Sequence, residues 1–304
     1  MLYSLLEHTD SFIVQSRFYG PKARYYHPTE ASVVLIDPFG NKKIMGKCLR
    51  QAYYRATGHQ RLPENPRSKT ITEMGNYVEK MMIEWWKQMG VLVSEKVKFN
   101  NETTRISGEL DCVLKNPETN QQYVGEVKSV YGYQAFAEIW GNRKHVAGPK
   151  KEHLLQTLVY LKEFEGILDY AVIYYVRRDN GARKEHIVRI FPDEEGSNGH
   201  IVYRAEVNGE PILDYTINDI YDRFALLHDH VLRGVAPEKE FLYKFDTPLI
   251  EKMFQDGDMS KSKYEKWTKG KEWPGDWQCS YCSWLPICQD VDPSQIVEEE
   301  EQDA

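Results

Sequence analysis

The sequence predicts an α/β fold in which helices flank a central mixed β-sheet and a cysteine-bound metal cluster joins the N- and C-terminal segments. Three observations predict it. Strand-like runs rich in β-branched and aromatic residues dominate the middle of the chain. Runs with helical spacing of apolar residues lie before, between and after them. Cysteines occur near both ends of the chain.

The first half is expected to hold two helices followed by a strand meander. The helices cover about residues 45–58 and 70–90, and the second repeats apolar residues at helical spacing: Met74, Tyr77, Val78, Met81 and Trp85. The strands cover residues 93–99, 104–114 and 121–130. Turn formers between the last two strands predict a β-hairpin.

The second half is expected to alternate between the two kinds of element. A helix covers about residues 149–164, with Pro149 in its first turn. Strands follow at residues 169–178, 185–191 and 200–207. A last long helix begins after Thr216, a cap candidate, and ends at Gly234. We expect one domain over residues 1–289 and a disordered acidic tail over 290–304.

Composition and charge narrow the class of protein. The chain has 304 residues and a formal net charge of -7, and the acidic tail accounts for this imbalance. No run of about 18 apolar residues occurs, and the N-terminus lacks a basic region followed by an apolar stretch. We therefore expect a cytoplasmic protein without membrane contact. The near-neutral body neither supports nor excludes nucleic-acid binding, because a local basic groove matters more than the net charge.

The stretch YVGEVKSVYG at residues 123–132 places two charges in an apolar strand. Glu126 and Lys128 share one face, because side chains alternate along a strand. A solvated surface with a chance ion pair is one explanation. A symmetric hairpin, however, pairs residues whose numbers sum to 237 and brings Asp111 opposite Glu126, with Glu109 on the same side. Neighbouring carboxylates are stable mainly with a divalent cation between them, which predicts a metal site.

Three of the five cysteines form the compact pattern C-x2-C-x5-C: Cys279, Cys282 and Cys288. Tetrahedral zinc and cubane iron-sulfur clusters need a fourth ligand. Cys112 follows Asp111 and is expected to point into the core, so Cys48 is the better candidate. Spacing alone does not separate zinc from iron-sulfur. Disulfides are disfavoured without a secretory signal.

Three short motifs occur in the order GELD at residues 108–111, EVK at 126–128 and QTLVY at 156–160. They resemble the PD-(D/E)xK nuclease superfamily. Together with one early and three late cysteines, they resemble its RecB-like exonucleases with a 4Fe-4S cluster, which include the CRISPR-associated RecB-like nuclease and AddB-type nuclease domains. The resemblance spans Cys48 to Cys288. One departure is the run GNYVE, where Glu79 replaces the family's metal-binding histidine.

The resemblance implies a restriction-endonuclease-like fold and a DNA exonuclease dependent on Mg²⁺ or Mn²⁺. It would prefer single strands or DNA ends and act in recombination, repair, phage genome processing or CRISPR adaptation, in a bacterial or phage-infected cell. A helicase, recombinase or integrase is a possible partner. The implied catalytic residues are Asp111, Glu126, Lys128, Gln156 and Tyr160. The implied metal ligands are Glu79, Asp111, Glu126 and the backbone carbonyl of Val127. The cluster ligands would be Cys48, Cys279, Cys282 and Cys288, with zinc as the alternative metal.

A basic loop before the 149–164 helix suits phosphate contacts and contains Arg143, Lys144, Lys150 and Lys151. A plain solvated loop is the alternative. Nearby Tyr131, Tyr133, Phe136 and Trp140 could stack on unpaired bases, although some of them are expected in the core. Three other functions stay open on the sequence. The same fold could carry a structure-specific endonuclease, or serve as a non-catalytic DNA-binding subunit. A zinc-clipped RNA-processing protein is the third.

Overall fold

The computed structural model describes residues 6, 9–10, 24–37, 40–63, 65–143, 145–193 and 201–290. Among them, seven strands form the main sheet in the order β3-β4-β5-β6-β7-β8-β9, and β1 and β2 form a separate hairpin. The strands are β1 (Ser32–Ile36), β2 (Lys42–Gly46), β3 (Leu92–Asn101), β4 (Ile106–Lys115), β5 (Gln122–Val130), β6 (Ala171–Arg177), β7 (Arg183–Asp193), β8 (Val202–Val207) and β9 (Glu210–Pro211).

The main sheet is mixed, as the sequence predicts. Strands β3, β4 and β5 form the expected antiparallel meander. Strand β5 then pairs in parallel with β6, and the remaining strands are antiparallel again. The parallel step needs a crossover, and the segment between β5 and β6 supplies it with two helices.

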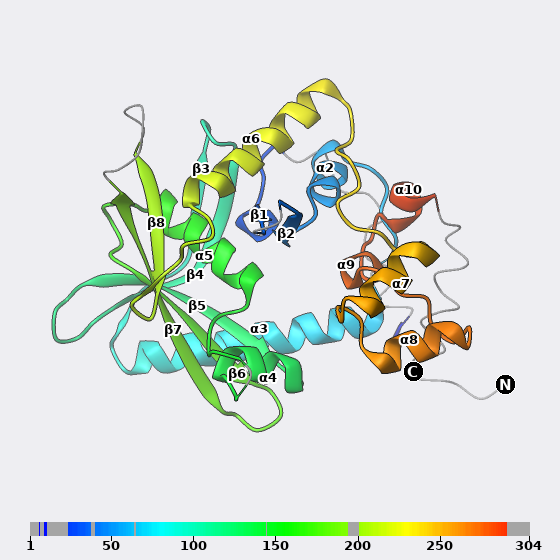
Figure 1. Cartoon of the computed structure of the whole chain (residues 1–304). Helices are drawn as coiled ribbons and strands as arrows, with labels where there is room; N and C mark the ends of the chain where they lie inside the picture. Colours follow the sequence, from blue (N-terminus) through cyan, green and yellow to red (C-terminus); the bar gives the residue numbers. More distant parts are fainter. Residues whose placement is uncertain are drawn as a thin grey trace.

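The helices lie on both sides of the main sheet and beyond one end of it (Figure 1). They are η1 (Pro28–Glu30), α2 (Leu49–Thr57), α3 (Pro66–Gln88), α4 (Tyr133–Trp140), α5 (Lys151–Glu163), α6 (Ile217–Arg233), α7 (Thr247–Gln255), α8 (Lys261–Thr268), α9 (Trp277–Ser280) and α10 (Leu285–Gln289). Helix α3 runs along one side of the sheet, and α5 and α6 lie on the other. Figure 1 shows α7–α10 gathered at the end of the molecule where α2 also lies.

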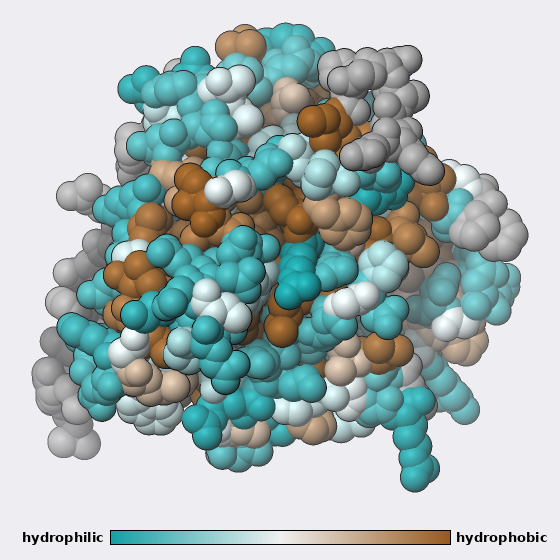
Figure 2. Space-filling model, turned by 90° about the vertical axis from the view of Figure 1, so that its left-hand side faces the viewer, coloured by the Kyte–Doolittle hydropathy of each residue, from teal (hydrophilic) through white to brown (hydrophobic). Residues whose placement is uncertain are grey.

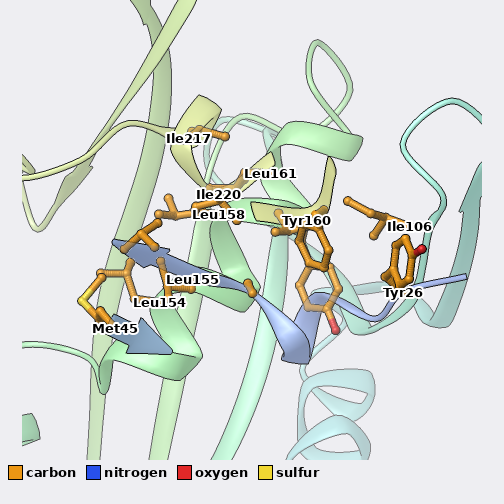
Figure 3. Packing of buried hydrophobic residues seen from close by; sticks show 14 of the residues in the cluster. Tyr26, Met45, Ile106, Leu154, Leu155, Leu158, Tyr160, Leu161, Ile217 and Ile220 are labelled. Carbon is orange, nitrogen blue, oxygen red and sulfur yellow. The ribbon is translucent and has the colours of Figure 1, made fainter. Parts of the chain in front are cut away.

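The main hydrophobic core lies between the sheet, α5, α6 and the β1-β2 hairpin. Helix α5 is at its centre, and Leu155 and Leu158 are fully buried. Figure 3 shows side chains of α5 between Met45 of β2 and Ile220 of α6. A second core under α3 contains Trp86 and other side chains of that helix packed on the opposite face of the sheet. The sheet is therefore covered on both faces, and a charged side chain buried within it costs free energy unless it is paired.

Several predicted element ends are confirmed. The side-chain oxygen of Thr216 accepts the N–H of Asp219 and caps α6, and Gly234 ends this helix in the left-handed conformation. Other ends differ. The predicted 45–58 helix begins only at residue 49, because residues 42–46 form strand β2. Gly46 ends that strand with a φ of +96°, and a Cβ there would lie 2.3 Å from the Ala31 carbonyl oxygen, so the turn requires glycine. Pro149 precedes the N-cap of α5 instead of lying in its first turn.

Helix α3 is present where the sequence predicts a helix, but its apolar side chains are distributed differently from what the spacing suggests. Met74, Tyr77, Met81 and Trp85 are all exposed by more than a third. The side chains that α3 buries in the second core are Met82, Ile83 and Trp86. Helix α4 and the β1-β2 hairpin were not predicted.

The surface seen from the left-hand side of Figure 1 is mainly hydrophilic, with hydrophobic side chains gathered in separate patches (Figure 2). No helix in the part of the chain that the structure describes is long and apolar enough to cross a membrane. The predicted acidic tail lies outside the described residues from residue 291 onward.

Candidate active site

Two strands of the main sheet bring the predicted carboxylates together. β4 and β5 pair in the predicted register, and their last paired residues are Cys112 and Gly125. Asp111 and Glu126 are the next residues of the two strands and therefore lie opposite each other just beyond the paired region. The Oδ2 atom of Asp111 accepts the backbone N–H of Val127 at 2.9 Å. This hydrogen bond holds the carboxylate at the fork between the two strands.

The Glu126 side chain is only 1% exposed. Its Oε1 atom lies 2.6 Å from the Lys128 ammonium and accepts a hydrogen bond from the Gln156 amide at 3.1 Å. Its Oε2 atom is buried and has no hydrogen-bond partner among the residues that the structure describes. An unpaired buried acceptor costs about 1–3 kcal/mol, and more when it is charged. This oxygen is therefore the atom of the site that most needs a ligand.

Helix α5 supports this pair with two polar side chains on one face. The Gln156 carbonyl oxygen accepts from Lys128 at 3.1 Å, while its amide donates to the Tyr160 hydroxyl at 2.7 Å. The Tyr160 hydroxyl in turn donates to the backbone carbonyl of Glu109 at 3.1 Å. Both Gln156 and Tyr160 are buried. Their position next to Glu126 and Lys128 suits a role in orienting these groups, and their burial keeps them from contacting a DNA backbone.

A second group of charges lies beside the first. The ammonium of Lys96 on β3 forms an ion pair with Glu79 of α3 and lies 3.8 Å from carboxylate oxygens of both Glu109 and Asp111. The predicted metal ligand Glu79 is therefore close to Asp111. Lys96 was not predicted as a site residue. The alternation of VSEKVKF gave no signal for it, because its orientation depends on an irregular backbone.

That irregularity lies at Lys96 itself, which adopts a positive φ of 52° within β3. The neighbours of Lys96 pair with Cys112 and Leu110, so Lys96 lies opposite Asp111. Leu110 packs into the main core and Cys112 into the core under α3, although they are two residues apart. The alternation of β4 thus changes at Asp111, and both strands are irregular at the point where the charges meet.

Burial and charge repulsion shift the pKa values of the site. Burial, followed by repulsion from Glu126 and Glu79, raises the pKa of Asp111 to about 8. Burial alone would lower the pKa of Lys128, but attraction to Glu126 and Asp111 outweighs it and raises that pKa. The same balance, with Glu79 as the strongest partner, raises the pKa of Lys96. The cluster holds more negative than positive charge and favours the binding of a cation.

The carboxylates point toward the two ammonium groups in this structure. Glu126 faces Lys128, while Glu79 and Glu109 face Lys96. Within the described ranges, no three His, Cys, Asp or Glu side chains converge on a point that could hold a metal ion. The oxygens available to a hard cation are those of Glu79, Asp111 and Glu126, with Glu109 beside them. The predicted contribution of the Val127 carbonyl stays a prediction.

Four cysteines line one hollow at the end of the molecule opposite the strand meander: Cys48, Cys279, Cys282 and Cys288. They come from the N-terminus of α2 and from the α9-α10 segment. All four carry free thiols. Burial raises the pKa of Cys48 and of Cys279 to about 12. Cys112 lies elsewhere, in the core under α3, with its thiol 3.4 Å from the Gly125 carbonyl oxygen.

The predicted basic cluster is described in part. Arg143 and Lys151 are exposed, Lys150 is half-buried, and Lys144 lies outside the described residues. Lys150 directly precedes α5, and its charge, like that of Lys128, helps to lower the pKa of His153. Tyr131 and Tyr133 expose most of their side chains.

A half-buried histidine, His153, lies one turn before Gln156 on α5 and was not predicted as a site residue. The Tyr175 hydroxyl accepts the backbone N–H of Lys150 at 3.0 Å and contacts Nδ1 of His153 at 2.9 Å. Burial and the nearby Lys128 hold the pKa of His153 well below its usual value. His153 is therefore neutral and ties the start of α5 to β6. Its place at i−3 from Gln156 was the only signal in the sequence.

Comparisons with known proteins add little. No model of a known protein family and no curated protein matches the chain. Among solved structures, it is similar to the crystal structure of SSO0001, with a TM-score of 0.37 and 12% identity over 76% of this chain and 87% of that chain. A similarity this distant carries no argument about function, which has to be inferred from the site.

Proposed function

We propose that this protein is a divalent-metal-dependent deoxyribonuclease that hydrolyses phosphodiester bonds as an exonuclease on single strands or DNA ends. The unpartnered Oε2 atom of Glu126 is the observation that carries the proposal. It belongs to a buried carboxylate whose other oxygen is held by Lys128 and Gln156. Such a carboxylate is suited to bind a metal ion, because the cation supplies the partner that its second oxygen lacks.

The electrostatics of the neighbouring carboxylate support the same conclusion. A raised pKa of about 8 means that Asp111 gives up its proton reluctantly near neutral pH. A divalent cation between Asp111 and Glu126 would replace that proton and remove the repulsion between the two groups. Carboxylate oxygens are hard ligands, which suit Mg²⁺ or Mn²⁺. Glu79 would be a further ligand, in place of the histidine of the proteins that the sequence resembles.

The chain's own residues divide the remaining work. A bound divalent ion would activate water and neutralise charge on the phosphate. Lys128, held by Glu126 and Gln156, presents its ammonium where the attacking water and the phosphate oxygens would lie. Gln156 fixes both partners of this ion pair, and Tyr160 fixes Gln156. Preorganised groups of this kind cost no reorganisation during the reaction.

We propose that the cysteines lining the hollow hold a 4Fe-4S cluster, with zinc as the alternative; among the described residues they do not converge on a point that could hold a metal ion. Thiols with a pKa near 12 stay protonated at neutral pH unless a metal replaces their protons. A cluster there would join α2 to the C-terminal α9-α10 segment and restrain both. We therefore assign it a structural role. It would restrain these two segments and take no part in hydrolysis.

The substrate path follows from charge. Arg143, Lys150 and Lys151 can neutralise phosphates without reading sequence, and exposed Tyr131 and Tyr133 can stack on unpaired bases. A structure-specific endonuclease would use the same residues. A binding subunit without catalysis would gain nothing from a buried Glu126-Lys128 pair, which is expensive to maintain. A helicase, recombinase or integrase would be the proposed partner.

The test is cleavage of end-labelled single- and double-stranded DNA, linear and circular, by anaerobically purified protein with Mg²⁺, Mn²⁺ or EDTA. The wild type is compared with Glu126→Gln and with Lys115→Met, a change at the far end of β4. We expect metal-dependent loss of linear DNA that Glu126→Gln abolishes and Lys115→Met retains. Cleavage of circular DNA would favour the endonuclease. Cleavage that persists in EDTA or in Glu126→Gln would refute the proposal.

A further inference from the structure

We propose that the Lys96 ammonium is a built-in counter-ion that occupies the carboxylate group of Glu79, Glu109 and Asp111 without metal and must be displaced when a divalent cation binds. The inference rests on the proposed metal-dependent function and names a residue that controls metal loading. In the described residues these carboxylates lie around the Lys96 ammonium and form no group that could hold a metal ion.

The contacts of Lys96 are those of a cation in a binding site. Its Nζ atom forms an ion pair with Glu79 and lies 3.8 Å from Oε1 of Glu109 and 3.8 Å from Oδ1 of Asp111. The three carboxylates come from α3 and from two positions of β4. The ammonium donates a hydrogen bond to Glu79 and acts on Glu109 and Asp111 through its charge, because 3.8 Å is beyond hydrogen-bond distance.

The backbone of β3 supports a specific role for this side chain. Lys96 has a φ of +52°, a left-handed conformation that a residue with a Cβ adopts at a cost. The residues on either side of it pair regularly with β4. The left-handed residue of β3 is therefore the one whose side chain reaches Glu79 and Asp111, apart from the register shift between Leu92 and Ser94 at the start of the strand.

The next lysine of the strand provides an internal comparison. Lys98 approaches one carboxylate, Glu109, at 3.7 Å, and its side chain is 78% exposed. The Lys96 side chain is 47% exposed and approaches three carboxylates. An ordinary surface ion pair looks like that of Lys98.

Competition with a metal follows from charge. A divalent cation bound to Glu79 and Asp111 would lie within a few ångströms of the Lys96 ammonium, and like charges repel strongly at that distance. Lys96 therefore has to leave as the metal enters. The Lys128 ammonium is held separately by Glu126 and Gln156 and can stay. Lys96 would stabilise the metal-free fold and raise the metal concentration that the site requires.

The test compares Mn²⁺ binding to wild type, Lys96→Met and Lys98→Met without DNA, by isothermal titration calorimetry and by electron paramagnetic resonance of free Mn²⁺. Both variants lose one positive charge from the same strand. We expect Lys96→Met to bind Mn²⁺ with a Kd about tenfold lower than wild type. This corresponds to a gain of about 1.4 kcal/mol in binding free energy when the competing ammonium is removed. We expect the Kd of Lys98→Met to stay within about twofold of the wild-type value.

Thermal melting gives a second readout, in which the size of the Mn²⁺-dependent shift separates a counter-ion from a merely structural lysine. In EDTA, Lys96→Met should melt below wild type, because its carboxylates lose their counter-ion. Saturating Mn²⁺ should raise its melting temperature by more than that of wild type. If wild type binds Mn²⁺ and the Kd of Lys96→Met is equal to or higher than that of wild type, the inference about Lys96 is overturned while the metal site stands. No binding by any of the three proteins would overturn the metal site and the inference together.

Discussion

Replacing Asp111 by asparagine should stabilise the metal-free protein, and more so at higher pH. Asp111 is buried near Glu126 and Glu79, and its pKa of about 8 lies far above the usual 3.8 of an aspartate. Asparagine keeps an oxygen that can accept the Val127 N–H, which the carboxylate now accepts at 2.9 Å. The substitution therefore removes the charge and retains the shape and the hydrogen bond.

The magnitude follows from linkage between protonation and folding. A raised native pKa means that the wild type is least penalised below pH 4, where both states are protonated, and loses stability as the pH rises toward 8. Each pH unit in this window costs up to about 1.4 kcal/mol. Relaxation of the site and coupling to Glu126 reduce the full effect. We expect the advantage of Asp111→Asn in the free energy of unfolding to grow by about 1–3 kcal/mol between pH 5 and pH 8.

Urea unfolding in EDTA at both pH values measures this directly. Glu109→Gln is the matched control, because it neutralises a carboxylate of the same group that is 38% exposed. Mn²⁺ should then stabilise wild type at pH 8 but stabilise Asp111→Asn much less, since asparagine is a poor ligand without charge. The reasoning is refuted if Asp111→Asn is less stable than wild type at pH 8 in EDTA, or if its advantage does not grow with pH.

Four further results are expected. Lys128→Met should lower DNA cleavage at least ~100-fold while Mn²⁺ binding persists, and cleavage near the wild-type rate would contradict the role of this ammonium. Gln156→Leu leaves the Glu126-Lys128 pair with fewer partners and should lower kcat by about 10–100-fold; an unchanged initial rate would argue against it. Cys282→Ala should lose bound iron or zinc and melt earlier, whereas Cys112→Ala should keep the metal; equal metal loss in the two, by elemental analysis, would rule out the assigned ligand set. Thr216→Ala removes the capping box of α6 and should cost about 1 kcal/mol in urea unfolding, and no change would show that the cap is dispensable.

Local sequence signals predicted the site strands well. The turn formers between β4 and β5 define the hairpin, and its symmetry places Asp111 opposite Glu126, as the pairing of Cys112 with Gly125 confirms. Register matters here because side chains alternate with a period of two, so a shift of β5 by one residue would turn Glu126 and Lys128 to the other face of the sheet. Gln156 and Tyr160 were predictable as a pair, because residues four apart share a face of a helix.

The direction in which side chains of α3 and β3 point was less predictable than the positions of these elements. Spacing identified the helix α3, yet its exposed apolar residues, such as Tyr77, repeat as regularly as its buried ones. Periodicity shows that a helix has an apolar stripe and leaves open which stripe meets the sheet when two exist. The same limit applies to β3, where the alternation of VSEKVKF gave no sign that Lys96 would turn toward Asp111.

The sequence by itself determined the mixed α/β class, the hairpin register and the carboxylate pair, because these depend on local propensity, on turn residues and on the two-residue period of strands. Only the tertiary structure decided that Glu126 leaves one oxygen without a partner, that four distant cysteines line one hollow, and that Lys96 occupies the carboxylate group. These features arise where segments far apart in the chain meet, and their burial and charge balance exist only after packing has brought them together.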